Sequence, residues 1–190
     1  AVREFLKELV ALVRWEHPGA LVSYANFPST EYLSVDFVDF LCFNVYLHDE
    51  TAFRRYIARL HNLAVDKPLV LTEFGVDSMR NGDDEQAQIL SWQVRAAFSA
   101  GVAGTFVFAW TDEWFTGGSE ITDWAFGLVT RERQPKKAFH ALKQYLCGES
   151  SMTQRVKIER YPRVSVIVCS YNGGKTLGDC LESLDEVTYP

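Results

Sequence analysis

Apolar residues recur along the chain with two alternating periods. Spacings of three and four residues predict helices, and short continuous apolar runs predict buried strands. The expected helices cover residues 1–17, 51–65, 84–101 and 135–146, and the expected strands cover 20–26, 38–46, 68–75 and 104–110. A short helix near 31–33 is left open. Continuously apolar strands that alternate with helices are typical of a parallel sheet covered by helices, so the expected fold class is α/β.

Each predicted strand runs into a loop that carries polar and aromatic side chains. These are Asn26 and Phe27, Tyr46 and His48, Glu73 and Phe74, and Asp112 and Trp114. Chemistry gathered at the carboxyl ends of parallel strands is typical of α/β barrel enzymes. A whole barrel needs eight such units and roughly 250 residues. We therefore expect residues 1–147 to form the carboxyl-terminal half of a (β/α)8 TIM barrel, with about four strands.

The pattern changes after Cys147. Residues 148–162 are polar and unpatterned, which predicts a linker, and residues 163–190 supply an apolar strand, a Gly-Gly turn and a helix. We interpret the last segment as the first βα unit of a doubly wound α/β domain. Both ends of the sequence fall inside predicted elements, so we expect the chain to be part of a longer protein.

Composition narrows the classes of function. Of 190 residues, 47% are apolar and 23% charged, a globular balance, and the net charge of −6 argues against nucleic-acid binding. No run is long enough to span a membrane, and no signal peptide is recognisable. The four cysteines lack metal-type spacing and are interpreted as reduced core residues. We expect a cytoplasmic protein, with membrane association of the full-length protein left open.

Four motifs, taken in order, carry a family resemblance. They are "LCFNVY" (41–46), "PLVLTEFGVDS" (68–78), "GTFVFAWTDEW" (104–114) and "FGLVTRERQPKKAFHAL" (126–142). Together they resemble the barrel of family 2 glycoside hydrolases, the retaining enzymes that include β-glucuronidase and β-galactosidase, over residues 1–146. The resemblance implies action on an oligosaccharide or polysaccharide without a cofactor.

The resemblance also implies roles for individual residues. Glu73 would be the catalytic nucleophile and Tyr46 would donate a hydrogen bond to it. Asn44 and Asp112 would bind sugar hydroxyls, and Trp110 or Trp114 would lie under a sugar ring. The alternatives are that Glu73 caps the next turn, that Tyr46 fills the barrel and that Trp114 is an ordinary surface aromatic. His48, His61 and His140 are scattered and are expected to be solvated or core residues, so no metal site is predicted.

A retaining glycosidase needs a second carboxyl group about 5–5.5 Å from the nucleophile. In the family this acid/base glutamate follows an asparagine on the fourth barrel strand, which would precede residue 1. Glu31, Asp49, Glu113 and Glu120 lie in suitable loops, but none follows an asparagine. We expect these residues alone to be inactive and the full-length protein to be active. The alternative is a non-catalytic carbohydrate-binding or scaffold module.

The segment "VSVIVCSYNGGKTLGDCLESL" (164–184) resembles the start of family 2 glycosyltransferases, although many α/β folds open similarly. By this resemblance Ser170, Tyr171 and Asn172 would contact a sugar nucleotide, and the complete glycosyltransferase could use a divalent metal. Where the family usually has proline, this chain has Cys169. Because a half-barrel exposes sheet edges, we also expect either pairing of two copies as a homodimer or cover by other parts of the full-length protein.

Overall fold

A computed structural model describes residues 1–147, 166, 168, 170 and 172–188. The chain divides into two compact units, residues 1–152 and 153–190, which we treat separately. The first unit contains α1 (Val2–Glu16), β1 (Ala25–Asn26), the 3-10 helix η1 (Pro28–Thr30), β2 (Leu41–Asn44), α2 (Glu50–Ala64), β3 (Leu69–Phe74), α3 (Ser78–Asn81), α4 (Asp83–Ser99), β4 (Gly104–Val107), β5 (Trp114–Thr116), β6 (Ser119–Ile121) and α5 (Lys137–Cys147). The described part of the second unit contains α6 (Leu177–Asp185).

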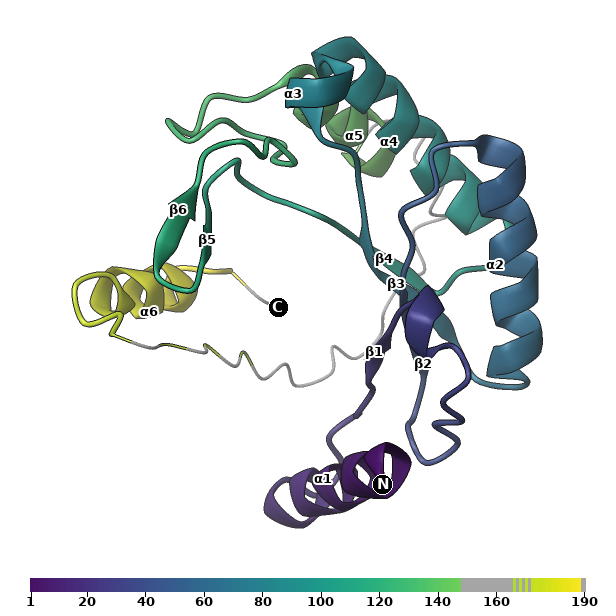
Figure 1. Cartoon of the computed structure of the whole chain (residues 1–190). Helices are drawn as coiled ribbons and strands as arrows, with labels where there is room; N and C mark the ends of the chain where they lie inside the picture. The colour runs from purple at the N-terminus through teal and green to yellow at the C-terminus, as the bar shows by residue number, and fades with distance from the viewer. Residues whose placement is uncertain (148–165, 167, 169, 171, 189–190) are drawn as a thin grey trace. The chain divides into compact units, whose positions relative to one another are not determined.

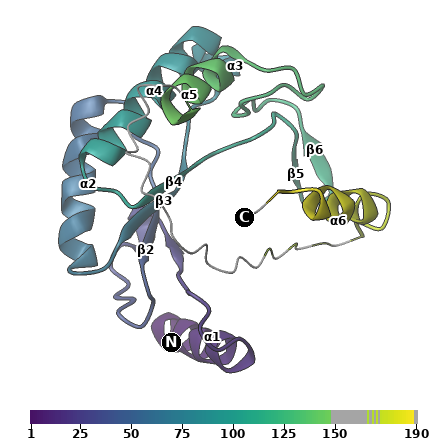
Figure 2. The same ribbon diagram turned by 180° about the vertical axis from the view of Figure 1, so that it is seen from behind.

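The first unit is built on a four-stranded sheet in the order β1-β2-β3-β4, and all three pairings are parallel. Helix α2 packs beside α4, and α4 beside α5. Figures 1 and 2, seen from opposite sides, show α2 and α4 along the same face of the sheet. The α/β class and the four parallel strands are confirmed. Within the described residues the sheet stays open, with β1 and β4 at its edges, as expected of a partial barrel.

The hydrophobic core lies between this sheet and its helices. Its largest fully buried apolar side chains include Phe43, Phe53, Phe74, Ile57, Leu60, Leu69, Leu71 and Leu90. Along β3, Leu69 and Leu71 are buried whereas Val70 between them is only partly buried. Because side chains alternate between the faces of a strand, the helix-covered face is the better buried one.

The strands are shorter than predicted, and one hairpin was missed. Strand β1 has two residues where 20–26 were expected, and β4 ends at Val107 instead of residue 110. The antiparallel hairpin β5–β6 lies in a segment interpreted as loop. Gly117 and Gly118 both have positive φ, of 55° and 80°, as a two-residue type I′ turn requires. The Gly-Gly pair was therefore the signal that could have predicted this hairpin.

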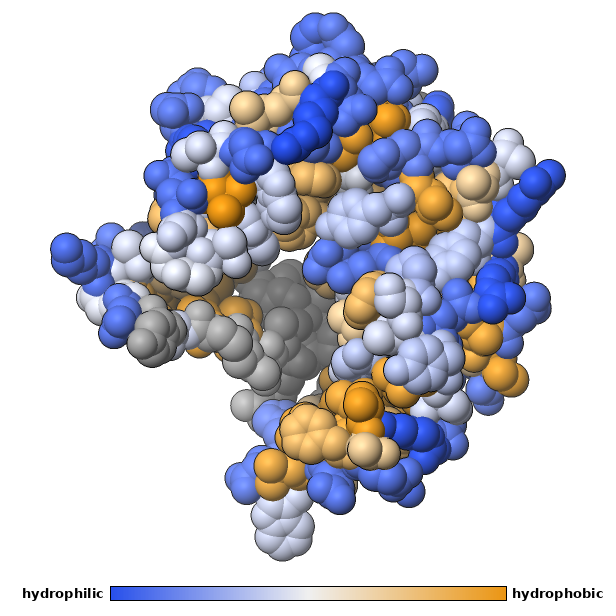
Figure 3. All heavy atoms as spheres, in the orientation of Figure 1, coloured by the Kyte–Doolittle hydropathy of each residue, from blue (hydrophilic) through white to orange (hydrophobic). Residues whose placement is uncertain are grey.

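Helix α1 is amphipathic and is tied to the loop before β2. Arg3 Nε donates to the Ser34 carbonyl at 2.9 Å, and Arg14 pairs with Asp39 at 2.8 Å. Val10 is its one buried residue. Its other apolar side chains, Val2, Phe5, Leu9, Leu12 and Val13, are exposed or partly exposed. Apolar side chains are visible near this helix at the lower end of Figure 3.

In the second unit, α6 follows the Gly-Gly turn as predicted. The predicted linker and nearly all of the strand expected before this turn lie outside the described residues. The interpretation of the cysteines as core residues holds for Cys42, but it is wrong for Cys147 and Cys180, which are exposed. No helix in the described part of the chain is both long and apolar enough to cross a membrane.

Candidate active site

Glu73 and Tyr46 meet at the carboxyl ends of neighbouring parallel strands. Asn44 of β2 pairs in register with Glu73 of β3, after a bulge that follows Phe43. Val45 N–H then donates to the Glu73 carbonyl at 2.8 Å, which carries the chain on to Tyr46 beside the glutamate. The Tyr46 hydroxyl donates to Glu73 Oε2 at 2.8 Å. The structure therefore brings together the two residues that the sequence placed 27 positions apart.

The Tyr46 phenol is held in its protonated, donating form. Partial burial raises the pKa of Tyr46 well above its ordinary value, and the hydrogen bond to the Glu73 carboxylate raises it further. The tyrosine ring is also held at its edges, because Phe108 and Phe126 form T-shaped contacts with it at 6.4 and 6.2 Å. Tyr46 is thus a fixed donor to one oxygen of the carboxylate.

The turn after Glu73 passes tightly against the end of β4. A Cβ added to Gly75 would lie 2.2 Å from the Phe108 carbonyl oxygen, so only glycine fits there. The Gly75 carbonyl also makes a 2.9 Å hydrogen bond with His48 Nε2. His48, expected to be an ordinary core or solvated residue, therefore ties the loop after β2 to the turn after the glutamate.

Asn44 is the last residue of β2 and lies two positions before Tyr46. Its Oδ1 accepts a 2.8 Å hydrogen bond from the Thr72 hydroxyl of β3. The described residues supply no acceptor for its Nδ2 group. The Asn44 amide is thus oriented through its oxygen, and its nitrogen is available to a ligand hydroxyl.

The predicted aromatic residues separate into two groups. Trp114 contacts Phe108, which itself contacts Tyr46, and the ring centroids of Trp114 and Phe108 are 5.1 Å apart. Trp114 also stacks on Trp124, with ring centroids 6.0 Å apart and an angle of 24° between the ring planes. Trp110 instead contacts Phe139 of α5, at 5.9 Å. The residue of the β4 end that faces Tyr46 is Phe108. Phe108, Trp124 and Phe126 were missed from the sequence, because no local pattern shows that their segments converge.

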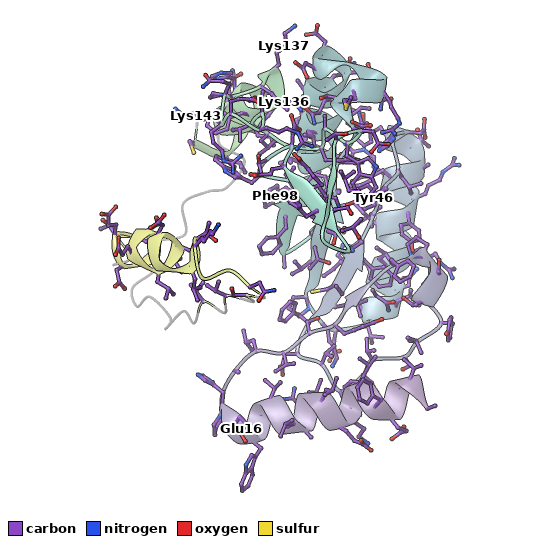
Figure 4. All side chains as sticks on the ribbon, turned by 60° about the vertical axis from the view of Figure 1, so that its left-hand side comes forward. Glu16, Tyr46, Phe98, Lys136, Lys137 and Lys143 are labelled. Atoms are coloured by element: carbon purple, nitrogen blue, oxygen red, sulfur yellow. The ribbon has the colours of Figure 1, made fainter. Side chains whose placement is uncertain are left out.

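Asp112 is engaged inside the protein. Its Oδ1 accepts from Gly127 N–H at 2.7 Å and from Lys136 Nζ at 3.1 Å. Lys136 also donates to Ser78 Oγ at 2.8 Å and to the Ala125 carbonyl at 3.2 Å. The Lys136 side chain is buried and that of Asp112 is only 12% exposed, and Figure 4 shows Lys136 turned inward while Lys137 points away. This pair ties the chain after β4 to the residue that precedes α5, and the bond from Lys136 to Ser78 adds the start of α3.

The predicted sugar-nucleotide residues lie in the second unit. Ser170 and Asn172 are exposed, and Asn172 has a left-handed φ of 54° next to the Gly-Gly turn. Tyr171 lies outside the described residues. Among the side chains that the structure describes, no three His, Cys, Asp or Glu residues gather as a metal site would require.

No protein-family model and no curated protein matches this sequence. Among solved structures, the chain is similar to a β-glucuronidase from Ruminococcus gnavus in complex with D-glucuronic acid. The TM-score is 0.65 at 25% identity, over 75% of this chain and 29% of that one. It is also similar to a GH5_18 protein from Streptomyces cattleya in complex with Manb1-4GlcNAc, with a TM-score of 0.65 at 16% identity, over 80% of this chain and 43% of that one.

A family 17 β-1,3-glucanosyltransferase from Rhizomucor miehei is similar with a TM-score of 0.55 at 18% identity, over 70% of this chain and 54% of that one. This chain thus spans between about a third and about half of these proteins. The fold is that of part of a glycoside hydrolase barrel. Glu73 and Tyr46 lie at the carboxyl-terminal edge of its sheet, where barrel enzymes place their active sites.

Proposed function

We propose that residues 1–147 carry the nucleophile half of a retaining glycoside hydrolase site, with Glu73 as nucleophile and Tyr46 as its positioning donor. The observation that carries this proposal is the 2.8 Å hydrogen bond from the Tyr46 hydroxyl to Glu73 Oε2. A glycosidase nucleophile must be ionised and aimed at the anomeric carbon. A fixed phenol donor on one carboxylate oxygen orients the carboxylate and leaves the other oxygen for attack.

The chemistry would proceed in two displacements. The Glu73 carboxylate attacks the anomeric carbon and forms a glycosyl ester while the glycosidic C–O bond breaks. A general acid gives its proton to the leaving oxygen. Water, or a sugar hydroxyl in a transfer reaction, then attacks the anomeric carbon, passes its proton to the same acid/base residue and releases the carboxylate.

The four candidate carboxylates in this chain are already engaged in other contacts. Three pair with arginines: Glu31 with Arg59, Glu113 with Arg133 and Glu120 with Arg131. The fourth, Asp49, accepts from Ala52 N–H and caps α2. The Arg59 guanidinium also holds the pKa of Glu31 below its usual range, the opposite of what a general acid needs. These contacts support the proposal that the acid/base residue comes from a part of the full-length protein outside these 190 residues.

The second unit extends the proposal to a fused enzyme. Residues 163–190 would begin a glycosyltransferase domain, with Ser170, Tyr171 and Asn172 against a sugar nucleotide. Support comes from the Gly-Gly turn, from the left-handed Asn172 before it and from α6 after it. A protein that both transfers and cleaves sugars would act on an oligosaccharide or polysaccharide that it extends, trims or rearranges.

Covalent labelling of the full-length protein with a panel of 2-fluoro glycosides tests the glycosidase proposal. Peptide mass spectrometry should find the label on the peptide that contains Glu73, and the probe that reacts names the sugar. Glu73→Gln should abolish labelling, whereas Glu113→Gln, a change at another loop glutamate, should retain it. A folded protein that takes no label from any probe would contradict the proposal.

One observation favours a second candidate, a carbohydrate-binding module without catalysis. Trp114 and Trp124 form a stacked pair in which each side chain is 38% exposed. Exposed aromatic faces of this kind suit the apolar face of a sugar ring. In that case oligosaccharides would bind the full-length protein equally well with or without Glu73→Ala, and no probe would label it. A pure scaffold would bind none of them.

A further inference from the structure

A pocket of about 430 Å³ opens beside Tyr46, between the loops that follow β1 and β2. Its lining comes from the loop after β1 (Phe27 and Pro28), from the end of β2 and the loop after it (residues 44–47), and from Tyr56 of α2. The volume lies within the range of about 300–1,000 Å³ typical of small-molecule sites. None of its lining residues except Asn44 and Tyr46 has a role in the proposed reaction.

The lining combines two aromatic side chains with one amide. Phe27 and Tyr46 are 44% and 40% exposed, so parts of their rings are accessible to a ligand. Most of the pocket surface is apolar. The Asn44 amide supplies a donor, because within the described residues its oxygen alone is engaged, by Thr72. A pyranose ring has the matching chemistry, with an apolar C–H face and hydroxyl groups at its rim. Aromatic walls with one placed polar group are typical of such sites.

The wall that carries Phe27 is held firmly in place. The buried Asn26 side chain accepts hydrogen bonds from Phe27 N–H at 3.2 Å and from the Thr30 hydroxyl. The Tyr56 hydroxyl, from α2, donates to Glu31 Oε2 at 2.9 Å. Since these contacts fix both ends of the segment that borders the pocket, a ligand would meet a preformed site.

Tyr46 links the pocket to the candidate nucleophile. Its ring lines the pocket, while its hydroxyl lies 2.8 Å from Glu73 Oε2. We propose that this pocket is a second sugar subsite next to the reacting sugar, with Phe27 as its stacking residue. The substrate class is then a chain of at least two sugars. This assignment as a subsite rests on the proposed function, because it takes Glu73 to mark where the reacting sugar lies.

Calorimetric titration of the full-length protein tests the subsite. The probes are cello-, laminari-, manno- and xylo-oligosaccharides of one to four units, and Glu73→Gln serves as the background that prevents turnover. Affinity should rise from the monosaccharide to the disaccharide of the series that binds. Phe27→Ala should weaken disaccharide binding roughly tenfold and leave monosaccharide binding unchanged, because only the second sugar loses apolar contact.

Tyr32→Ala is the matched control. Tyr32 is an exposed aromatic of the same segment, but it borders a different hollow, between this segment and the end of α2. It should leave every affinity unchanged. Equal effects of the two variants, no effect of Phe27→Ala, or no binding by any probe would each overturn the subsite.

The two proposals fail in different ways. Labelling of Glu73 by a 2-fluoro glycoside, together with no effect of Phe27→Ala, would refute the subsite and leave the glycosidase proposal standing. Disaccharide binding that depends on Phe27, without labelling by any probe, would refute the nucleophile and retain the pocket as a saccharide-binding site.

Discussion

The Tyr46 hydroxyl donates to Glu73 Oε2 at 2.8 Å, and the two residues reach each other only because β2 and β3 are parallel neighbours. The same two loops are tied a second time, by His48 Nε2 and the Gly75 carbonyl at 2.9 Å. Two links between adjacent strand ends restrict the movement of the glutamate. A carboxylate held in this way suits a reaction in which misplacement of the attacking atom is costly.

Tyr46→Phe should slow labelling of Glu73 by the reactive 2-fluoro glycoside by roughly 10- to 100-fold, since a hydrogen bond to a charged group contributes about 1.5–3 kcal/mol. The ring contacts with Phe108 and Phe126 remain, so the melting temperature should change little. Tyr32→Phe is the control, because it removes a phenol hydroxyl away from Glu73 and outside the pocket that Tyr46 lines. Equal labelling rates in the two variants would argue against a positioning role.

Gly75→Ala should destabilise the protein by about 2–3 kcal/mol or more, because the new methyl group would overlap the Phe108 carbonyl. Gly104→Ala tests the same change in the neighbouring strand β4, where the added Cβ would have its nearest contacts at 3.8 Å, with Val70. Urea denaturation should show a large loss for the first variant and little change for the second. A tolerated Gly75→Ala would mean that β3 and β4 end farther apart than described.

Lys136→Met should cost about 3–5 kcal/mol, because it leaves the mostly buried Asp112 carboxylate without its cation. The double variant Lys136→Met/Asp112→Asn should recover part of that loss. Lys137→Met changes the next residue, whose ion pair with Asp84 is exposed, and should cost less than about 1 kcal/mol. A double-mutant cycle by urea denaturation measures the coupling, and purely additive effects would contradict it.

The stability of the first unit should fall in acid partly through Asp39. The Val22 N–H donates to its carboxylate at 2.7 Å and, with help from Arg14, lowers the pKa of Asp39 despite partial burial. Because the folded pKa lies below the unfolded value of about 3.9, this stabilisation is present above that pH and is lost as pH falls through the folded pKa.

Asp39→Asn should therefore lower the melting temperature at about pH 7 and flatten the decline of the melting temperature between about pH 4 and pH 2. Thermal unfolding followed across this range measures both effects. Asp84→Asn serves as the control, because the Asp84 side chain is 86% exposed and its ion pair with Lys137 is screened by solvent. If the melting temperature fell equally steeply with falling pH in the wild type and in Asp39→Asn, Asp39 would not contribute to the loss of stability in acid.

Local patterns were sufficient for most helices and for the order of the strands. The amphipathic spacing from Val2 onward predicted both ends of α1 to within one residue. Asp49, just before α2, caps that helix, because its carboxylate accepts a hydrogen bond from a backbone N–H of the first turn. Strand lengths were overestimated, because an apolar run such as 20–26 does not show which of its residues find a hydrogen-bonded neighbour, and Leu21 of this run is exposed in the structure. Only Ala25 and Asn26 of that run pair with β2.

The sequence by itself determined the α/β class, the four parallel strands and the position of Glu73 at the end of one of them. These properties follow from periodicity and from the way strand ends align in a parallel sheet. Only the tertiary structure decided which side chains meet. It placed Phe108 rather than Trp110 against Tyr46, bound Asp112 to Lys136, and opened a pocket behind Phe27. Contacts of this kind depend on bulges, turns and packing between segments far apart in the chain, and no local pattern encodes them.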